Sequence, residues 1–205
     1  MSEVARSKRE FRVPADKFAA RRAELADAAL QTLAELGYAR TSLREIAQNS
    51  RFSHGVLHYY FSDKVDLIAC CVRNYKAKCV ERFDQLIGDA VFYDEFMDQF
   101  LTNLAGTLRD GAQMHRLWYD LRTQALFEES FRSEVQEIDK SLEGMIWRAI
   151  SRAYELRGVR PRLSPGFCYA MFDGLFQKAL LGYLAGDSKA VQEMQSEIRE
   201  FLSMH

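Results

Sequence analysis

Residues 42–64 constrain the fold of this chain more than any other segment, because they hold two short helical patterns joined by a tight turn. Ser42 and Glu45 have the S-x-x-E spacing of a capping box, in which the serine hydroxyl accepts from the glutamate backbone and the glutamate side chain reaches back. Three apolar residues then share one helical face: Leu43, Ile46 and Ala47. Ser53 supplies a second N-cap, for a helix over residues 53–60. The segment therefore predicts a helix-turn-helix.

The second of these helices has the composition of a surface that contacts DNA. In a helix-turn-helix the first helix crosses the DNA backbone, and the N-terminal residues of the second enter the major groove. His54, Gly55 and Val56 would lie in the groove, and a glycine there costs about 1 kcal/mol against alanine, which suggests a need for close approach. Leu57 and Phe61 should face the core. The remaining side chains would face phosphate or solvent: His58, Tyr59, Tyr60 and Lys64.

With the residues upstream, this region resembles the tetracycline-repressor (TetR) family of bacterial transcription regulators. The resemblance covers residues 21–70 and includes Leu25, Ala29, Leu33, Gly37, Tyr38, Thr41, Ile46 and Ala47. It implies that His54, Gly55 and Val56 read bases. It also implies that the DNA backbone is contacted by Thr41, Ser42, Arg44, Ser53, His58, Tyr59, Tyr60 and Lys64.

Two features of this region depart from the family pattern. Ser50-Arg51-Phe52 stands where the family usually has Ala-Gly-Val, so a non-glycine residue must take or avoid the left-handed conformation that glycine accepts freely. His58 replaces the usual first tyrosine of the aromatic run, which could make a phosphate contact sensitive to pH. His54 and His58 are spaced for two metal ligands, but no third ligand lies near them in sequence, so we expect no metal site and no cofactor.

The charge distribution points to the same half of the chain. The net charge of the whole chain is -1, but residues 1–82 carry 15 Lys and Arg against 10 Asp and Glu, whereas residues 83–205 carry 13 against 19. Neutralisation of phosphates is the main sequence-independent source of DNA affinity. Residues 1–14 add four basic side chains and are expected to be either an arm that follows DNA or a disordered terminus: Arg6, Lys8, Arg9 and Arg12.

Other functional classes find little support in the sequence. There is no apolar run of about 18 residues and no signal peptide, so we expect a cytoplasmic protein without a membrane partner. The sequence contains no G-x-S-x-G, P-loop, H-E-x-x-H or glycine-rich dinucleotide motif, which argues against an enzyme; an all-helical enzyme or scaffold remains the less favoured alternative. Cys70, Cys71, Cys79 and Cys168 lack zinc-type spacing and suit a helical core, although a redox-responsive regulator through the first three is an alternative.

Helical periodicity continues to the end of the chain and predicts an all-α fold. Residues 15–62 form the predicted DNA-binding domain of three helices, and residues 63–205 the predicted ligand-binding and dimerisation domain. An apolar residue recurs at every fourth position from Leu67 to Phe83, which indicates a long connecting helix over residues 63–87. The other expected helices span 15–36, 42–49, 53–60, 92–109, 112–127, 130–157, 165–185 and 188–203.

The second half is rich in aromatic residues, which either pack as core or line a pocket. The family resemblance implies a small-molecule pocket there, and the aromatic content favours an apolar or aromatic effector. His115, Arg122 and Gln124 are candidate polar anchors. The expected lining residues are Phe96, Phe100, Trp118, Tyr119, Arg122, Phe172 and Phe176.

Small residues mark one side of the expected helix over residues 165–185. Ala170, Gly174 and Gly182 lie at i, i+4 and i+12, which allows another helix to approach closely, either from a second copy or from the same chain. A twofold homodimer is expected independently, since paired recognition helices must reach successive major grooves of a palindromic operator. The resemblance favours a repressor released by its effector, with an activator as the alternative.

Overall fold

The computed structural model describes residues 15–36 and 42–203, and every regular element within these ranges is helical. Thr41 and the basic segment 1–14 lie outside the described residues. The helices are α1 (Ala15–Leu36), α2 (Leu43–Gln48), α3 (His54–Tyr60), α4 (Lys64–Asp89), α5 (Tyr93–Asp110), α6 (Ala112–Ala125), the 3₁₀ helix η1 (Glu129–Phe131), α7 (Arg132–Leu156), α8 (Pro165–Leu184) and α9 (Ala190–Ser203). The prediction of an all-α fold is confirmed.

Local capping explains where the short helices begin. Ser42 accepts from the Glu45 amide, and Glu45 returns a hydrogen bond to the Ser42 amide, which completes the predicted capping box of α2. Ser53 accepts from the Val56 amide and starts α3. Asp63 caps α4 in the same way. Each cap satisfies one of the backbone donors that a helix N-terminus leaves free.

The turn between α2 and α3 avoids the left-handed conformation, since no described residue other than glycine has a positive φ. The Phe52 amide donates to the Ser50 hydroxyl at 3.2 Å. The Arg51 guanidinium lies 5.0 Å from the centre of the Phe52 ring and pairs with Glu24 of α1 at 2.8 Å. These contacts show how a turn without glycine is held against α1.

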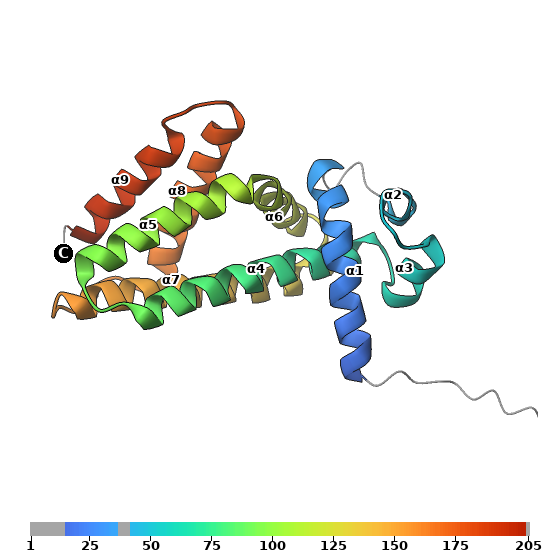
Figure 1. Cartoon of the computed structure of the whole chain (residues 1–205), viewed down its shortest axis with the longest axis horizontal. Coiled ribbons are helices and arrows are strands. Elements are labelled where there is room, and N and C mark those ends of the chain that lie inside the picture. Colours follow the sequence, from blue (N-terminus) through green and yellow to red (C-terminus); the bar gives the residue numbers. More distant parts are fainter. Residues whose placement is uncertain (1–14, 37–41, 204–205) are drawn as a thin grey trace, which may run out of the picture.

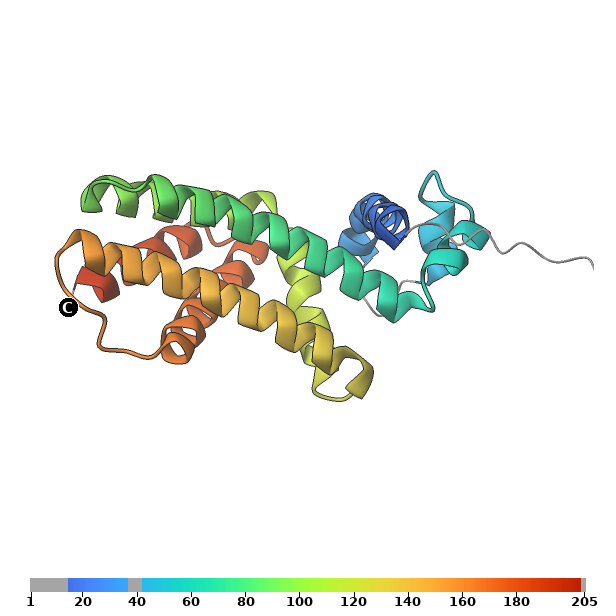
Figure 2. The same cartoon turned by 90° about the horizontal axis from the view of Figure 1, so that it is seen from below.

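The long helix α4 joins the two ends of the molecule (Figure 1). Near its start α4 packs against α1, and along the rest of its length it packs against α7. Figure 2 shows α4 and α7 running side by side. The contact with α1 is close, because the Cys71 thiol lies 3.1 Å from the backbone carbonyl oxygen of Ala26. Within the described ranges, no helix has both the length and the apolar composition needed to cross a membrane.

Helices α5 to α9 complete a bundle around one side of α4. Its core includes Phe83, Phe100 and Phe172, whose rings meet edge to face at centroid distances of 5.5 and 6.1 Å. At the junction of α5 and α6, Gly111 lets a side chain of α4 approach closely, because a Cβ at this position would lie 1.9 Å from the Tyr75 hydroxyl. The expected helix over 112–127 ends earlier, at Ala125, and the two residues that follow are exposed.

Candidate functional site

The first candidate surface is the exposed side of α3. Leu57 is fully buried and Val56 half-buried, whereas His54, Gly55, His58 and Tyr59 are exposed. No described residue lies within 4 Å of a Cβ built on Gly55, so no contact in the described part of the chain requires a glycine there. The energetic cost of a helical glycine is therefore left for an external contact to explain. This helix can present side chains and bare backbone to another molecule.

Two histidines of α3 form a pair on this surface. The Nε2 atoms of His54 and His58 are 3.1 Å apart, and their rings meet at a centroid distance of 4.3 Å. One of these rings donates and the other accepts. Among the described residues no group of three or more potential metal ligands occurs.

An arginine of α1 holds the end of α3 against the start of α4. Arg22 donates to the Tyr60 carbonyl oxygen at 2.8 Å and forms an ion pair with Asp66, and its guanidinium lies 4.7 Å from the centre of the Phe61 ring. Burial opposes ionisation of Asp66, but the hydrogen bonds from Arg22 and Ser62 and the charge of Arg22 together outweigh it and lower the pKa of that carboxyl. Tyr60 also packs on Phe18, with ring centroids 4.9 Å apart. The orientation of α3 is thus tied to α1 and α4 together.

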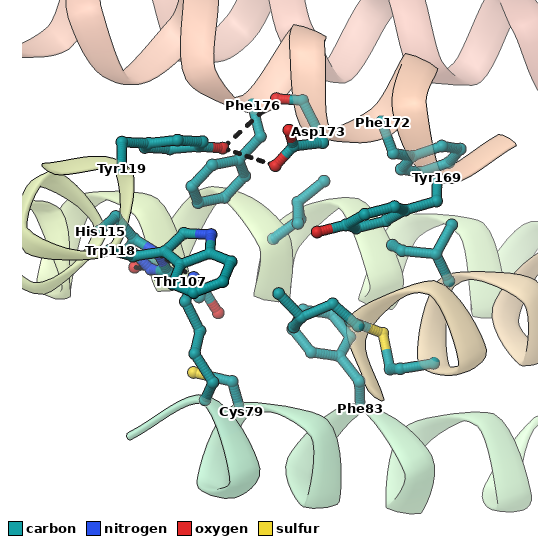
Figure 3. Close-up of a pocket in the computed structure, with 15 residues that line it drawn as sticks. Cys79, Phe83, Thr107, His115, Trp118, Tyr119, Tyr169, Phe172, Asp173 and Phe176 are labelled. Carbon is teal, nitrogen blue, oxygen red and sulfur yellow. Dashed lines mark hydrogen bonds between the residues drawn. The ribbon is translucent and has the colours of Figure 1, made fainter. Parts of the chain in front are cut away.

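The second candidate site is a cavity of about 70 Å³ inside the bundle (Figure 3). Figure 3 shows the rings of Trp118 and Tyr169 extending into it from opposite sides, while Phe83 rises from α4. The walls are mainly apolar, with a few polar groups from α4, α5, α6 and α8. The lining residues are Lys76, Cys79, Phe83, Leu104, Thr107, His115, Trp118, Tyr119, Leu142, Met145, Ile146, Tyr169, Phe172, Asp173 and Phe176.

A buried lysine and a buried histidine form a chain of hydrogen bonds at one wall. The Lys76 ammonium donates to Nδ1 of His115 at 3.0 Å, and Nε2–H of the same ring donates to the Thr107 carbonyl oxygen at 3.2 Å. Burial, together with the charge of Lys76, holds the pKa of His115 well below its usual range, so the ring is neutral. Burial also lowers the pKa of Lys76, to about 8. The cavity therefore contains a cation at neutral pH.

Carboxylates at the opposite wall are held by their own partners. Arg122 pairs with Asp173 at 2.5 Å and with Asp139 at 3.6 Å. The Tyr119 hydroxyl donates to Asp173 at 3.0 Å, and the Tyr169 hydroxyl donates to Asp139. Burial and the adjacent carboxylates raise the pKa of both phenols far above the usual range, so both remain donors. This cluster joins α6, α7 and α8.

The structure brings together some of the predicted pocket residues but not all of them. Trp118, Tyr119, Phe172 and Phe176 line the cavity. Phe96 and Phe100 lie in the core next to it without lining it, and Arg122 is engaged by the two carboxylates. The polar lining residues missed by the prediction include Lys76, which the sequence places on the apolar face of α4 with Val72 and Cys79.

The predicted small-residue face of α8 is divided between two environments. Ala170 and Gly174 are exposed, and none of the residues that the structure describes lies within 4 Å of a Cβ built on Gly174. Gly182 instead faces α9, where an added Cβ would lie 2.6 Å from the Cβ of Ala190. Exposed apolar side chains continue the outer face of α8: Phe167, Leu181 and Leu184.

All four cysteines are buried and free of disulfides. Burial raises the pKa of the Cys71 thiol well above its ordinary value, and it also raises that of Cys70. Oxidation of a thiol follows its thiolate character and its exposure. The surroundings of these thiols are those of apolar core residues.

Comparison with known proteins places these features in a known context. Residues 25–70 match the model of bacterial regulatory proteins of the tetR family. The HTH-type transcriptional regulator BetI from Burkholderia thailandensis is 26% identical over 193 residues, which is 89% of this chain and 93% of that protein. The protein of the same name from Paraburkholderia xenovorans is 41% identical over 54 residues, 26% of this chain and 28% of that protein.

Solved structures share the fold. The regulator FadR from Bacillus subtilis in complex with stearoyl-CoA superimposes with a TM-score of 0.71 at 18% identity, covering 87% of this chain and 96% of that one. A putative transcriptional regulator from Saccharomonospora viridis in complex with choline gives a TM-score of 0.70 at 17% identity, covering 90% of this chain and 96% of that one. At these identities the likeness concerns the fold.

Proposed function

Because the chain belongs to the tetR family of bacterial regulatory proteins, whose model it matches over residues 25–70, we propose that α3 reads an operator and that the cavity binds the effector that controls this reading. The chain is a ligand-responsive, DNA-binding transcriptional regulator. The single observation that carries the assignment of the DNA surface is α3 itself, a capped helix whose exposed N-terminal turn includes a glycine that no contact with residues 15–36 or 42–203 requires. We place the division between the DNA-binding and effector domains at residues 62 and 63.

We propose that the protein acts as a homodimer on a palindromic operator. Two recognition helices separated by one turn of DNA need a twofold partner. The outer face of α8 supports this, because Ala170 and Gly174 leave room for a second helix beside exposed Phe167 and Leu181. Gly182 is already used by α9 of the same chain, so we assign it no part in the dimer.

Repression relieved by a small effector is the mode of action that we propose, with activation as the alternative. The buried thiols make a redox-responsive regulator through Cys70, Cys71 or Cys79 the weaker candidate. We propose that the chain catalyses no reaction, since the family model that it matches describes regulatory proteins. We also propose that it works in the cytoplasm, where its operator would lie.

Base reading by α3 can be tested by selecting operators from random DNA with the full-length protein. We expect the wild type to enrich a palindrome, and His54→Ala and Val56→Ala each to change the preferred base at symmetric positions by about tenfold, since one base contact contributes about 1–3 kcal/mol. Enrichment of an unchanged sequence by both variants would contradict the assignment of these two side chains.

Phosphate contact by α2 predicts a change in salt dependence without a change in sequence preference. Arg44→Ala should weaken binding to all DNA sequences alike and reduce the slope of log affinity against log salt by about one. The matched control is Arg160→Ala, an exposed arginine in the loop after α7, at the other end of the molecule from α3. Equal slopes for the two variants would remove Arg44 from the interface.

A further inference from the structure

The cavity contains hydrogen-bond donors that lack acceptors. The Trp118 indole is fully buried and lines the cavity, and its Nε1–H has no partner among the described residues. A buried donor without an acceptor costs about 1–3 kcal/mol. Such a group points to an acceptor that the protein itself does not supply.

Lys76 also has hydrogen-bond donors without acceptors, and it carries a charge. Its ammonium carries three donors, and the described residues provide one acceptor, Nδ1 of His115 at 3.0 Å. The ammonium also lies 5.4 Å from the centre of the Trp118 ring, so both unsatisfied groups belong to the same wall. Within the described part of the chain no carboxylate forms an ion pair with Lys76, because Asp173 and Asp139 are paired with Arg122.

We propose that the effector is a small monocarboxylate with an apolar tail, whose carboxylate accepts hydrogen bonds from Lys76 Nζ and Trp118 Nε1. This inference rests on the proposed function of the cavity and names the chemical class of its ligand. A carboxylate offers acceptors only and a compensating charge. The tail would lie against Phe83, Met145 and Phe172, which continue the lining away from the polar wall.

The size of the cavity limits the tail. Pockets for drug-sized ligands measure about 300–1,000 Å³, whereas this cavity has about 70 Å³. A short aliphatic or single-ring acid therefore fits with modest movement of the walls. The aromatic walls would also suit a quaternary ammonium, but a second cation beside Lys76 would be repelled where burial already disfavours positive charge.

The positions of the two donors connect the proposed ligand site with the end of the molecule that holds α3. Lys76 lies on α4 and Trp118 on α6, so a carboxylate held by both would connect these helices. Lys76 is also 12 residues, about 18 Å along the helix, from the start of α4 beside α3. An effector shifts the equilibrium only by its differential affinity for the two forms. We expect the form in which Lys76 and Trp118 both reach the carboxylate to be the one with lower DNA affinity.

The test uses full-length protein and two measurements, calorimetric binding and release of the selected operator. The probes are the straight-chain monocarboxylates from acetate to octanoate, benzoate and phenylacetate, with the primary amide of each acid and choline as comparison compounds. We expect at least one carboxylate to bind and to release the operator. Its matched amide should bind at least tenfold more weakly.

Two variants test whether Lys76 and Trp118 bind the carboxylate. Lys76→Met and Trp118→Phe should each weaken the best carboxylate at least tenfold, while Lys178→Met, on the exposed side of α8, should bind it like the wild type. Operator affinity without ligand and the melting temperature report whether each variant is folded. Two variants on different helices keep the test valid if one fails to fold.

Three outcomes would overturn the inference: no carboxylate binds, an amide or choline binds as tightly as the best carboxylate, or both donor variants bind the acid like the wild type. The proposed function would survive each of them as long as the operator is bound. Failure to select any operator would instead overturn the proposed function, while calorimetry would still decide whether the cavity takes a carboxylate.

Discussion

Replacing Arg122 with leucine is expected to lower the free energy of unfolding by about 3 kcal/mol, because it leaves two partly buried carboxylates without their cation. Asp139 and Asp173 both pair with Arg122 in the native structure. Burial disfavours the Arg122 cation, but the hydrogen bond to Asp173 and the charges of Asp173 and Asp139 together outweigh it and raise the pKa of Arg122. Denaturant unfolding followed by circular dichroism would measure the loss as a lower midpoint.

Two further variants separate this effect from loss of packing. Adding Asp173→Asn to Arg122→Leu should recover part of the lost stability, since one uncompensated charge is removed. Arg148→Leu breaks an ion pair with Asp84 in which both side chains are well exposed, and should cost less than about 1 kcal/mol. A cost for Arg122→Leu no larger than that of Arg148→Leu would show that the cluster does not stabilise the bundle.

Replacing Lys76 with methionine is expected to stabilise the protein at pH 7 by about 2 kcal/mol. The pKa of Lys76 falls from an ordinary value of about 10.4 to about 8, and this difference corresponds to about 3 kcal/mol of unfavourable burial of the charge. Methionine has a similar length without the charge. About 1 kcal/mol is subtracted for the lost hydrogen bond to His115.

The dependence of the free energy of unfolding on pH tests whether burial lowers the pKa of Lys76. Between about pH 8 and pH 10 the native state has released the Lys76 proton and the unfolded state has kept it, so the wild type should gain stability with rising pH. The charged and titratable groups facing Lys76 are Cys79, His115, Arg122, Asp139 and Asp173. Because Lys76→Met retains all of them, the difference between the two proteins isolates the lysine. A difference that stays constant over this range would contradict the lowered pKa.

Local signals in the sequence were sufficient to predict the helices. The caps at Ser42 and Ser53 depend on residues within three positions, and the amphipathic spacing of α4 depends on its own side chains. The expected helix over 112–127 was wrong by two residues at its end, where the chain turns towards η1. The residues at which helices end are decided by packing between elements as well as by local sequence.

The cavity could be predicted only in part, because periodicity identifies a buried face but not what that face meets. Phe96 and Phe100 have the same spacing as lining residues, yet they pack in the core beside the cavity. Lys76 and Asp173 are separated by nearly half the chain, so no local pattern relates them. The roles of the DNA-binding, pocket and dimer residues remain predictions.

The packing of α1 bears on how such regulators can diversify. Helix α1 contacts α6, a wall of the cavity, as well as α4, so the proposed DNA-binding domain and the proposed effector domain share an interface beyond the covalent junction. A chimaera cut at residue 63 would place a foreign α1 on this α4 and α6, and Lys78 would lose its partner Asp27. Exchanging the proposed effector domain between relatives would therefore require matched changes on α1. Operator recognition and effector recognition would then evolve together.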